Sequence, residues 1–128
     1  MTQRSDYEGT VVYQTRDGSQ IRELMHPKVH GNRAQSLAEA TVAPGQKTVL
    51  HRHEQSEELY HIVAGEGVLT LGSERLTVAP GDTICIAPRT PHCIENTGKQ
   101  PLRVLCCCSP AYSHEDTVLL EPSTEKCD

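Results

Sequence analysis

Residues 45–65 read GQKTVLHRHEQSEELYHIVAG, and this stretch decides the fold. Two runs of strand-forming residues, 48–53 and 59–63, flank the polar, turn-prone segment 54–57. Successive side chains of a strand point to opposite faces of its sheet, and a short polar connection lets the second run return beside the first. The stretch therefore predicts two neighbouring antiparallel strands.

Residues able to bind a metal ion share faces of these two strands. His51 and His53 are one residue apart, which puts their Cα atoms about 7 Å apart on one face, close enough to share an ion. Glu58 and Tyr60 share a face of the second strand, so a carboxylate can join the two imidazoles. His92 opens a later strand-like run and offers a third imidazole. Mixed nitrogen and oxygen ligands suit Mn, Fe, Co, Ni, Cu or Zn better than Ca or Mg. With seven histidines in the chain, one His-x-His pair alone does not establish a site.

Short strand-like runs separated by turn residues occur along most of the chain. This pattern predicts an all-β fold, an antiparallel sandwich or barrel, without a competing amphipathic helix. The expected strands are 11–15, 36–42, 48–53, 59–63, 67–71, 75–78, 83–87, 92–96 and 102–107. We expect segment 25–32 to form a loop and residues 121–128 to fray.

Two spaced motifs resemble those of the cupin family. The first consists of Gly45, five residues, His51-Arg52-His53, four residues, Glu58, six residues and Gly65. The second begins at Gly81 in Pro80-Gly81-Asp82, places His92 as its ligand and ends at Asn96. Two departures, Ala87 where the family usually has proline and Arg89 where it usually has glycine, change the turn before His92.

The resemblance implies one cupin domain over residues 1–128, a jelly-roll antiparallel β-barrel. The barrel core would span about residues 36–108, with extra strands or loop in 1–35 and a tail in 109–128. It also implies that a single divalent transition-metal ion is held inside the barrel by His51, His53, Glu58 and His92. Many cupins pair into homodimers through their sheets, and we expect a homodimer here.

Several neighbours of the motif admit two interpretations. Glu57 could replace Glu58 as the carboxylate ligand, although the six-residue spacing to Gly65 favours Glu58. Tyr60 has the parity of Glu58 and should point inward, either as a proton donor or as a core aromatic residue. His61 has the opposite parity, so we expect it on the outside of the barrel.

Three further features outside the motif are interpreted more simply. Arg89 either meets an anionic substrate at the pocket mouth or is only solvated. Three consecutive cysteines alternate on a strand, so one or two should face the interior as small apolar side chains: Cys106, Cys107 and Cys108. His26 and His30 are four residues apart, but in a segment expected to be a loop this spacing carries no helical meaning.

The charge and hydropathy of the chain exclude several classes of partner. The formal net charge is −5, so no basic surface for nucleic acid is expected. No stretch approaches the roughly 20 apolar residues that cross a bilayer, and no membrane partner is expected. The N-terminal residues lack the apolar core of a secretory signal. We therefore expect a cytoplasmic protein with a small-molecule substrate.

An ion with four protein ligands keeps one or two positions open, which favours an enzyme over a structural metal site. The ligand set is similar to that of quercetinases, acireductone dioxygenases and germin-like oxidases. The resemblance therefore implies a dioxygenase acting on a small polar chelating substrate, with Glu58 as base. A non-oxidative isomerase, lyase or decarboxylase, in which Tyr60 or Glu58 moves a proton, is the alternative. A ligand-binding cupin without catalysis is the third hypothesis.

Overall fold

A computed structural model describes residues 3–15 and 17–121 of the chain. Their elements, in order, are β1 (Val12–Gln14), β2 (Gln20–Met25), α1 (Pro27–His30), β3 (Ser36–Val42), β4 (His51–His53), β5 (Glu57–Ala64), β6 (Gly67–Leu71), β7 (Glu74–Val78), β8 (Thr83–Ile86), β9 (His92–Asn96), β10 (Leu102–Ser109) and β11 (Thr117–Leu119). Of the end expected to fray, residues 122–128 lie outside the described part.

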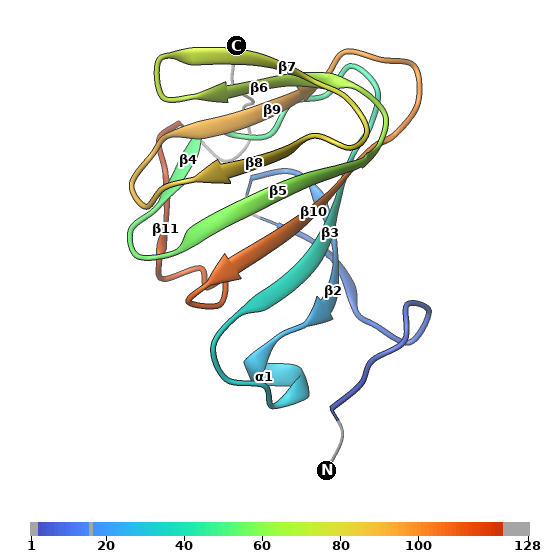
Figure 1. Ribbon diagram of the computed structural model, residues 1–128, viewed down its shortest axis with the longest axis vertical. Helices are drawn as coiled ribbons and strands as arrows, with labels where there is room; N and C mark the ends of the chain where they lie inside the picture. Colours follow the sequence, from blue (N-terminus) through green and yellow to red (C-terminus); the bar gives the residue numbers. More distant parts are fainter. Residues whose placement is uncertain (1–2, 16, 122–128) are drawn as a thin grey trace.

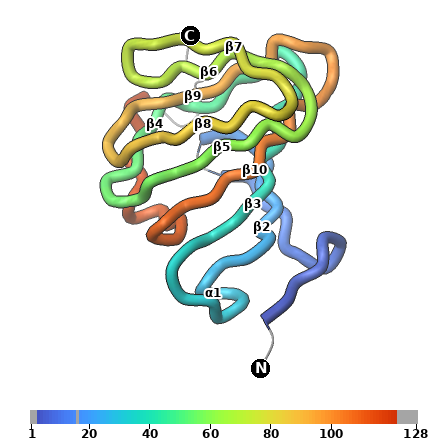
Figure 2. Tube along the Cα trace, in the orientation of Figure 1, coloured from blue at the N-terminus to red at the C-terminus, as the bar shows by residue number. Residues whose placement is uncertain are grey.

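The strands form two antiparallel sheets that face each other (Figure 1). One sheet has the order β1-β2-β3-β10-β5-β8, and the other has the order β11-β4-β9-β6-β7. Figure 2 shows β10 lying between β3 and β5, which precede it by far in the sequence. Most pairings therefore join distant segments. The all-β antiparallel barrel expected from the sequence is confirmed.

The core lies between the two sheets and is aliphatic apart from Tyr60, since the chain has no Phe or Trp. Its largest fully buried apolar side chains are Ile62, Leu69, Ile86, Leu102, Val49, Val78 and Val104. Burying one such side chain contributes about 1.5–3 kcal/mol relative to leaving it in water. On β5 and β10 the inward face that carries Ile62 and Val104 also carries residues of the site.

Glycine is required where β5 turns into β6. Gly65 has a φ of +84°, and a Cβ there would lie 2.7 Å from the carbonyl oxygen of Pro101. A Cβ on Gly67 would lie 2.3 Å from the carbonyl oxygen of Glu95. Any larger residue would clash with the neighbouring backbone, so the turn that closes the first motif depends on both glycines.

Two strands were not predicted. β2 has the sequence QIRELM, whose glutamate, leucine and methionine do not favour strands, and it forms by pairing with β1 and β3. β11 has only three residues and pairs with β4, from His51 opposite Leu119 to His53 opposite Thr117. Both strands therefore depend on tertiary pairing rather than on local sequence.

The loop expected over residues 25–32 contains the short helix α1, so this expectation was wrong. Nδ1 of His26 accepts a hydrogen bond from the backbone N–H of Lys28, and Pro27 occupies the first helical position. Gly31 ends the helix in the left-handed region. The backbone N–H of His26 also donates to Nδ1 of His30. The four-residue spacing of these histidines therefore does correspond to one turn of helix.

No helix within the described residues has the length and apolar character needed to cross a membrane.

Candidate metal centre

The three histidines meet because β4 and β9 are neighbours. His51 and His53 lie on β4 with both side chains buried, as the alternation of a strand requires. His92 begins β9 and is the cross-strand partner of His51, with ring centroids 4.2 Å apart. Each of the three offers a ring nitrogen within 4.8 Å of those of the other two. This group could hold a metal ion.

Each imidazole directs its Nδ1 atom at an oxygen of the protein. The partners are the carbonyl of Val49 for His51 at 2.7 Å, the hydroxyl of Thr117 for His53 at 3.0 Å and the carbonyl of Thr90 for His92 at 2.9 Å. The Thr117 hydroxyl itself donates to the carbonyl of Ser113 at 2.8 Å, so it accepts a hydrogen bond from His53. Neutral rings with the proton on Nδ1 carry the lone pair on Nε2, the atom that binds a metal.

Glu58 reaches this cluster from β5, in the other sheet. Its Oε1 lies 3.1 Å from Nε2 of His53 and 3.3 Å from Nε2 of His92. Its Oε2 accepts a hydrogen bond from the thiol of Cys108 at 3.3 Å. Glu57 is exposed, so the structure brings Glu58 and not Glu57 into the cluster.

Burial and mutual charge set the protonation of the cluster. Burial by itself would raise the pKa of Glu58, but the nearby imidazoles of His53 and His92 outweigh it, and the pKa lies well below its usual value. Burial, together with the neighbouring His92, lowers the pKa of His51 to about 4. Burial would also lower the pKa of His53, yet Glu58 raises it above the usual value. The cluster therefore combines an ionised carboxylate with imidazoles held close together.

The donor set fits a divalent transition metal. Nε2 of His92 is fully buried and makes no hydrogen bond within the described residues, although Glu58 lies nearby. A buried polar atom without a partner is costly, and an ion bound between the Nε2 atoms and the carboxylate would satisfy it. Imidazole and carboxylate donors suit first-row transition metals.

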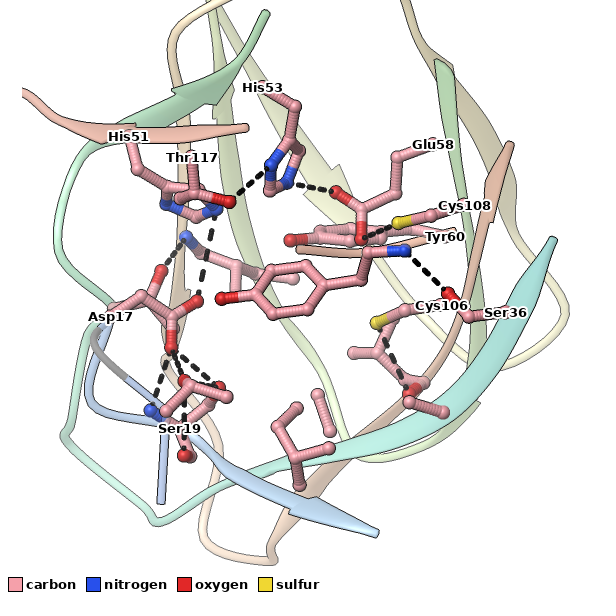
Figure 3. A pocket seen from close by; sticks show the side chains of 18 of the residues that line it. Asp17, Ser19, Ser36, His51, His53, Glu58, Tyr60, Cys106, Cys108 and Thr117 are labelled. Atoms are coloured by element: carbon pink, nitrogen blue, oxygen red, sulfur yellow. Dashed lines mark hydrogen bonds and ion pairs between the residues drawn. The ribbon is translucent and has the colours of Figure 1, made fainter. Parts of the chain in front are cut away.

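His51, His53 and Glu58 line a cavity of about 50 Å³ (Figure 3). Tyr60 points into the barrel with its ring edge-on to His92, at a centroid distance of 5.9 Å. Burial first, and then the charge of Glu58, raises the pKa of the Tyr60 phenol well above its usual value. Tyr60 therefore faces the cavity as a neutral hydroxyl group.

Two residues of the cavity were missed by the sequence analysis. Asp17 lies in the β1–β2 turn, with Oδ2 3.9 Å from Nε2 of His51. Thr117 lies on β11 and holds His53. An Asp-Gly pair in a turn and a threonine in a polar tail carry no local sign of a site, so only the tertiary pairing reveals them.

The remaining predicted neighbours take separate places. Arg89 is exposed and has a φ of +65°, so it adopts the left-handed conformation that glycine usually supplies. Its backbone N–H donates to the carbonyl of His53 at 2.6 Å, which ties the turn before His92 to β4. His61 is exposed and bonds Thr83. Two of the three cysteines, Cys106 and Cys108, line the cavity.

Comparisons with known proteins are consistent with this geometry. A family model described as a cupin domain matches residues 38–108. An uncharacterized protein of Methanocaldococcus jannaschii is 53% identical over 118 residues, covering 92% of this chain and 94% of that protein. The oxalate-binding protein of Thermotoga maritima is 34% identical over 84 residues, covering 66% of this chain and 65% of that protein. The crystal structure of a predicted oxalate decarboxylase from Thermotoga maritima has a TM-score of 0.72 at 25% identity, covering 86% of this chain and 99% of that one.

Proposed function

This chain belongs to the cupin family, and from that premise we propose that it is a metal-dependent enzyme acting on a small polar substrate. The proposed ligands of the ion are His51, His53, Glu58 and His92. The observation that carries the proposal is the convergence of three imidazoles whose Nδ1 atoms are already engaged by protein oxygens. A divalent ion bound there would polarise an oxygen of the substrate and make an adjacent proton more acidic.

We propose a non-oxidative reaction, of the isomerase, lyase or decarboxylase kind, as the first candidate. Tyr60 is a protonated phenol directed into the cavity, so it is placed to give a proton to a bound substrate. Glu58 has both oxygens engaged, one by the imidazoles and one by the Cys108 thiol. Because of these contacts we assign Glu58 first to metal binding; its action as a base would require it to leave them.

A dioxygenase is the second candidate. The donor set of three imidazoles and one carboxylate favours it, since such sets hold redox-active ions with open positions for substrate and oxygen. Aliphatic side chains line part of the cavity and provide the apolar surroundings that suit dioxygen: Ile21, Ala40, Val42, Ile94 and Val104. Both candidates use the same four ligands.

The experiment begins with elemental analysis of protein purified without added metal. About one transition-metal ion per chain, removable by a strong chelator, is expected. The loaded protein is then incubated with a panel of small hydroxy acids, hydroxyketones and diketones while product formation and oxygen consumption are followed. Product without oxygen uptake supports the first candidate, and uptake supports the second.

Absence of any tightly bound ion after reconstitution with Mn, Fe, Co, Ni, Cu or Zn contradicts the metal-dependent proposal. Bound ion without turnover favours a ligand-binding role.

We also propose that two copies of the chain pair through the six-stranded sheet. A row of outward-facing apolar side chains crosses four of its strands, with Cys107 between Leu37 and Leu59, and Leu59 beside Cys85. Leu37 and Leu59 are exposed. An exposed apolar row on a sheet face is typical of a protein interface. The cytoplasmic location and the single-domain organisation expected from the sequence stay predictions.

A further inference from the structure

We infer that Asp17 selects the class of molecule that binds on the open side of the proposed metal centre. It would admit a ligand that is uncharged or cationic and donates a hydrogen bond, such as a hydroxyl compound, and it would disfavour a dianion such as oxalate. The inference rests on the proposed metal site and concerns which substrates that site accepts.

The Asp17 carboxylate is held in a fixed orientation. Its Oδ1 accepts hydrogen bonds from the backbone N–H of Ser19 at 3.0 Å and the Ser19 hydroxyl at 2.7 Å, and also from the hydroxyl of Thr15. Its Oδ2 lies 3.9 Å from Nε2 of His51 (Figure 3). One oxygen is thus anchored by the turn, and the other faces the imidazole cluster.

The turn that carries Asp17 is also fixed to the strand that leads to the histidines. The backbone N–H of Val49 donates to the carbonyl of Asp17 at 2.7 Å, two residues before His51. This bond fixes the backbone of Asp17 beside the segment that leads to His51, in addition to the side-chain contacts of the carboxylate. Asp17 therefore forms part of the cavity wall, and its position does not require a bound ligand.

The described lining of the cavity is acidic. It includes the carboxylates of Asp17, Glu23 and Glu58, and no lysine or arginine occurs among the lining residues of 3–15 and 17–121. Three carboxylates outweigh the charge of one divalent ion. An incoming dianion would meet Asp17 across a short distance in a partly dry site, where like charges repel strongly. A hydroxyl or amino group would instead donate to the Oδ2 atom of Asp17.

This feature is specific to the part of the chain outside the family core. The cupin model matches residues 38–108, whereas Asp17 lies in the β1–β2 hairpin that precedes them. The selectivity inferred here therefore comes from the hairpin and does not follow from the shared barrel.

The test uses Co(II)-loaded protein, with the visible spectrum of the ion as the readout of ligand binding. Two probes are titrated: oxalate, a dianion, and glycolamide, an uncharged hydroxyl donor. In Asp17→Asn we expect oxalate to bind about tenfold or more tightly than in the unsubstituted protein, and glycolamide to bind more weakly. Asp17→Glu, which keeps the charge, should keep oxalate binding weak. Asp82→Asn, the same change in an exposed turn, should alter neither affinity.

Three results would overturn the inference. Asp17→Asn could leave both affinities unchanged while Co(II) remains bound at one ion per chain. It could weaken oxalate and glycolamide equally, which indicates a disturbed turn and not a removed charge. Asp17→Glu could behave like Asp17→Asn, which excludes charge as the cause. If the unsubstituted protein binds neither Co(II) nor any other ion of the set Mn, Fe, Ni, Cu and Zn, the metal centre itself is refuted and the inference falls with it.

Discussion

Oε1 of Glu58 lies 3.3 Å from Nε2 of His92, although the two residues belong to different sheets. Glu58 is carried by β5 and His92 by β9, so their contact exists only when the sheets face each other as they do in the folded barrel. The proposed metal ligands therefore bridge the two halves of the core, and an ion bound there would link the sheets. Metal binding and folding stability should be coupled.

Replacing His92 by alanine should remove most of the metal. The substitution deletes one of three convergent imidazoles and leaves Glu58 with fewer partners, so we expect the affinity for Co(II) or Zn(II) to fall by at least tenfold. Competition with a chelator measures the affinity, and circular dichroism checks that the fold persists. His61→Ala is the control, because His61 is exposed on the outer face of β5. Equal metal affinity in the two variants would contradict the proposed ligand set.

Thr117→Val should weaken metal binding without touching a proposed ligand. The change removes the hydroxyl that accepts the Nδ1 hydrogen of His53 and keeps the shape of the side chain. Partners of this kind orient a metal-binding imidazole, and losing one typically reduces affinity about 10–100-fold. Thr83→Val is a matched control, since Thr83 bonds Nδ1 of the exposed His61 at 2.8 Å. The hypothesis fails if Thr117→Val and Thr83→Val bind the metal equally well.

The sequence was informative where local spacing determines geometry. The His-x-His pair on β4 and the alternation of β5 predicted which side chains point inward, and Tyr60 and His61 face inward and outward as expected. The all-β antiparallel class followed from the same alternation. These predictions needed only the two-residue period of a strand and the turn chemistry between strands.

The parts that sequence reasoning missed depend on distant pairing. Asp17 is placed beside His51 by docking of a hairpin, and Thr117 is placed beside His53 by a strand of three residues. The helix α1 was missed because proline and glycine in a short segment were interpreted as loop signals, whereas here they start and end one helical turn. Such short elements have little periodicity from which they can be recognised.

Leu59→Glu should separate the proposed dimer. Leu59 is 40% exposed at the centre of the apolar row on β5, so a carboxylate there would be buried at an interface but hydrated in a monomer. Light scattering should show a dimer for the unsubstituted protein and a smaller species for the variant, with metal content unchanged. Val29→Glu, at an exposed site on the helix α1 outside the sheets, controls for an added charge. A monomeric unsubstituted protein would refute the dimer directly.

The metal-free protein should lose stability as the pH falls from about 6.5 towards 4. The folded-state pKa of His51 is about 4 because of burial and the nearby His92, whereas in the unfolded chain an imidazole titrates near 6.5, a value typical of exposed histidine. Within this interval the unfolded state binds the proton and the folded state does not. The contribution of His51 to the free energy of unfolding is therefore fully present above pH 6.5. It is lost as the pH falls from 6.5 to 4, and the loss is on the order of 3 kcal/mol.

His53 acts with the opposite sign, so a variant is needed to isolate the effect of His51. Burial lowers the pKa of His53, but Glu58 raises it to a net value above the usual one. Its contribution to the free energy of unfolding is therefore present below about pH 6.5 and is lost as the pH rises through its folded-state pKa.

Urea unfolding of chelator-treated protein between pH 7.5 and 5 should show a steeper loss of stability in the unsubstituted protein than in His51→Gln. His61→Gln should follow the unsubstituted protein. Parallel curves for His51→Gln and the unsubstituted protein would mean that folding leaves the pKa of His51 unshifted, which contradicts the lowering expected from burial beside His92.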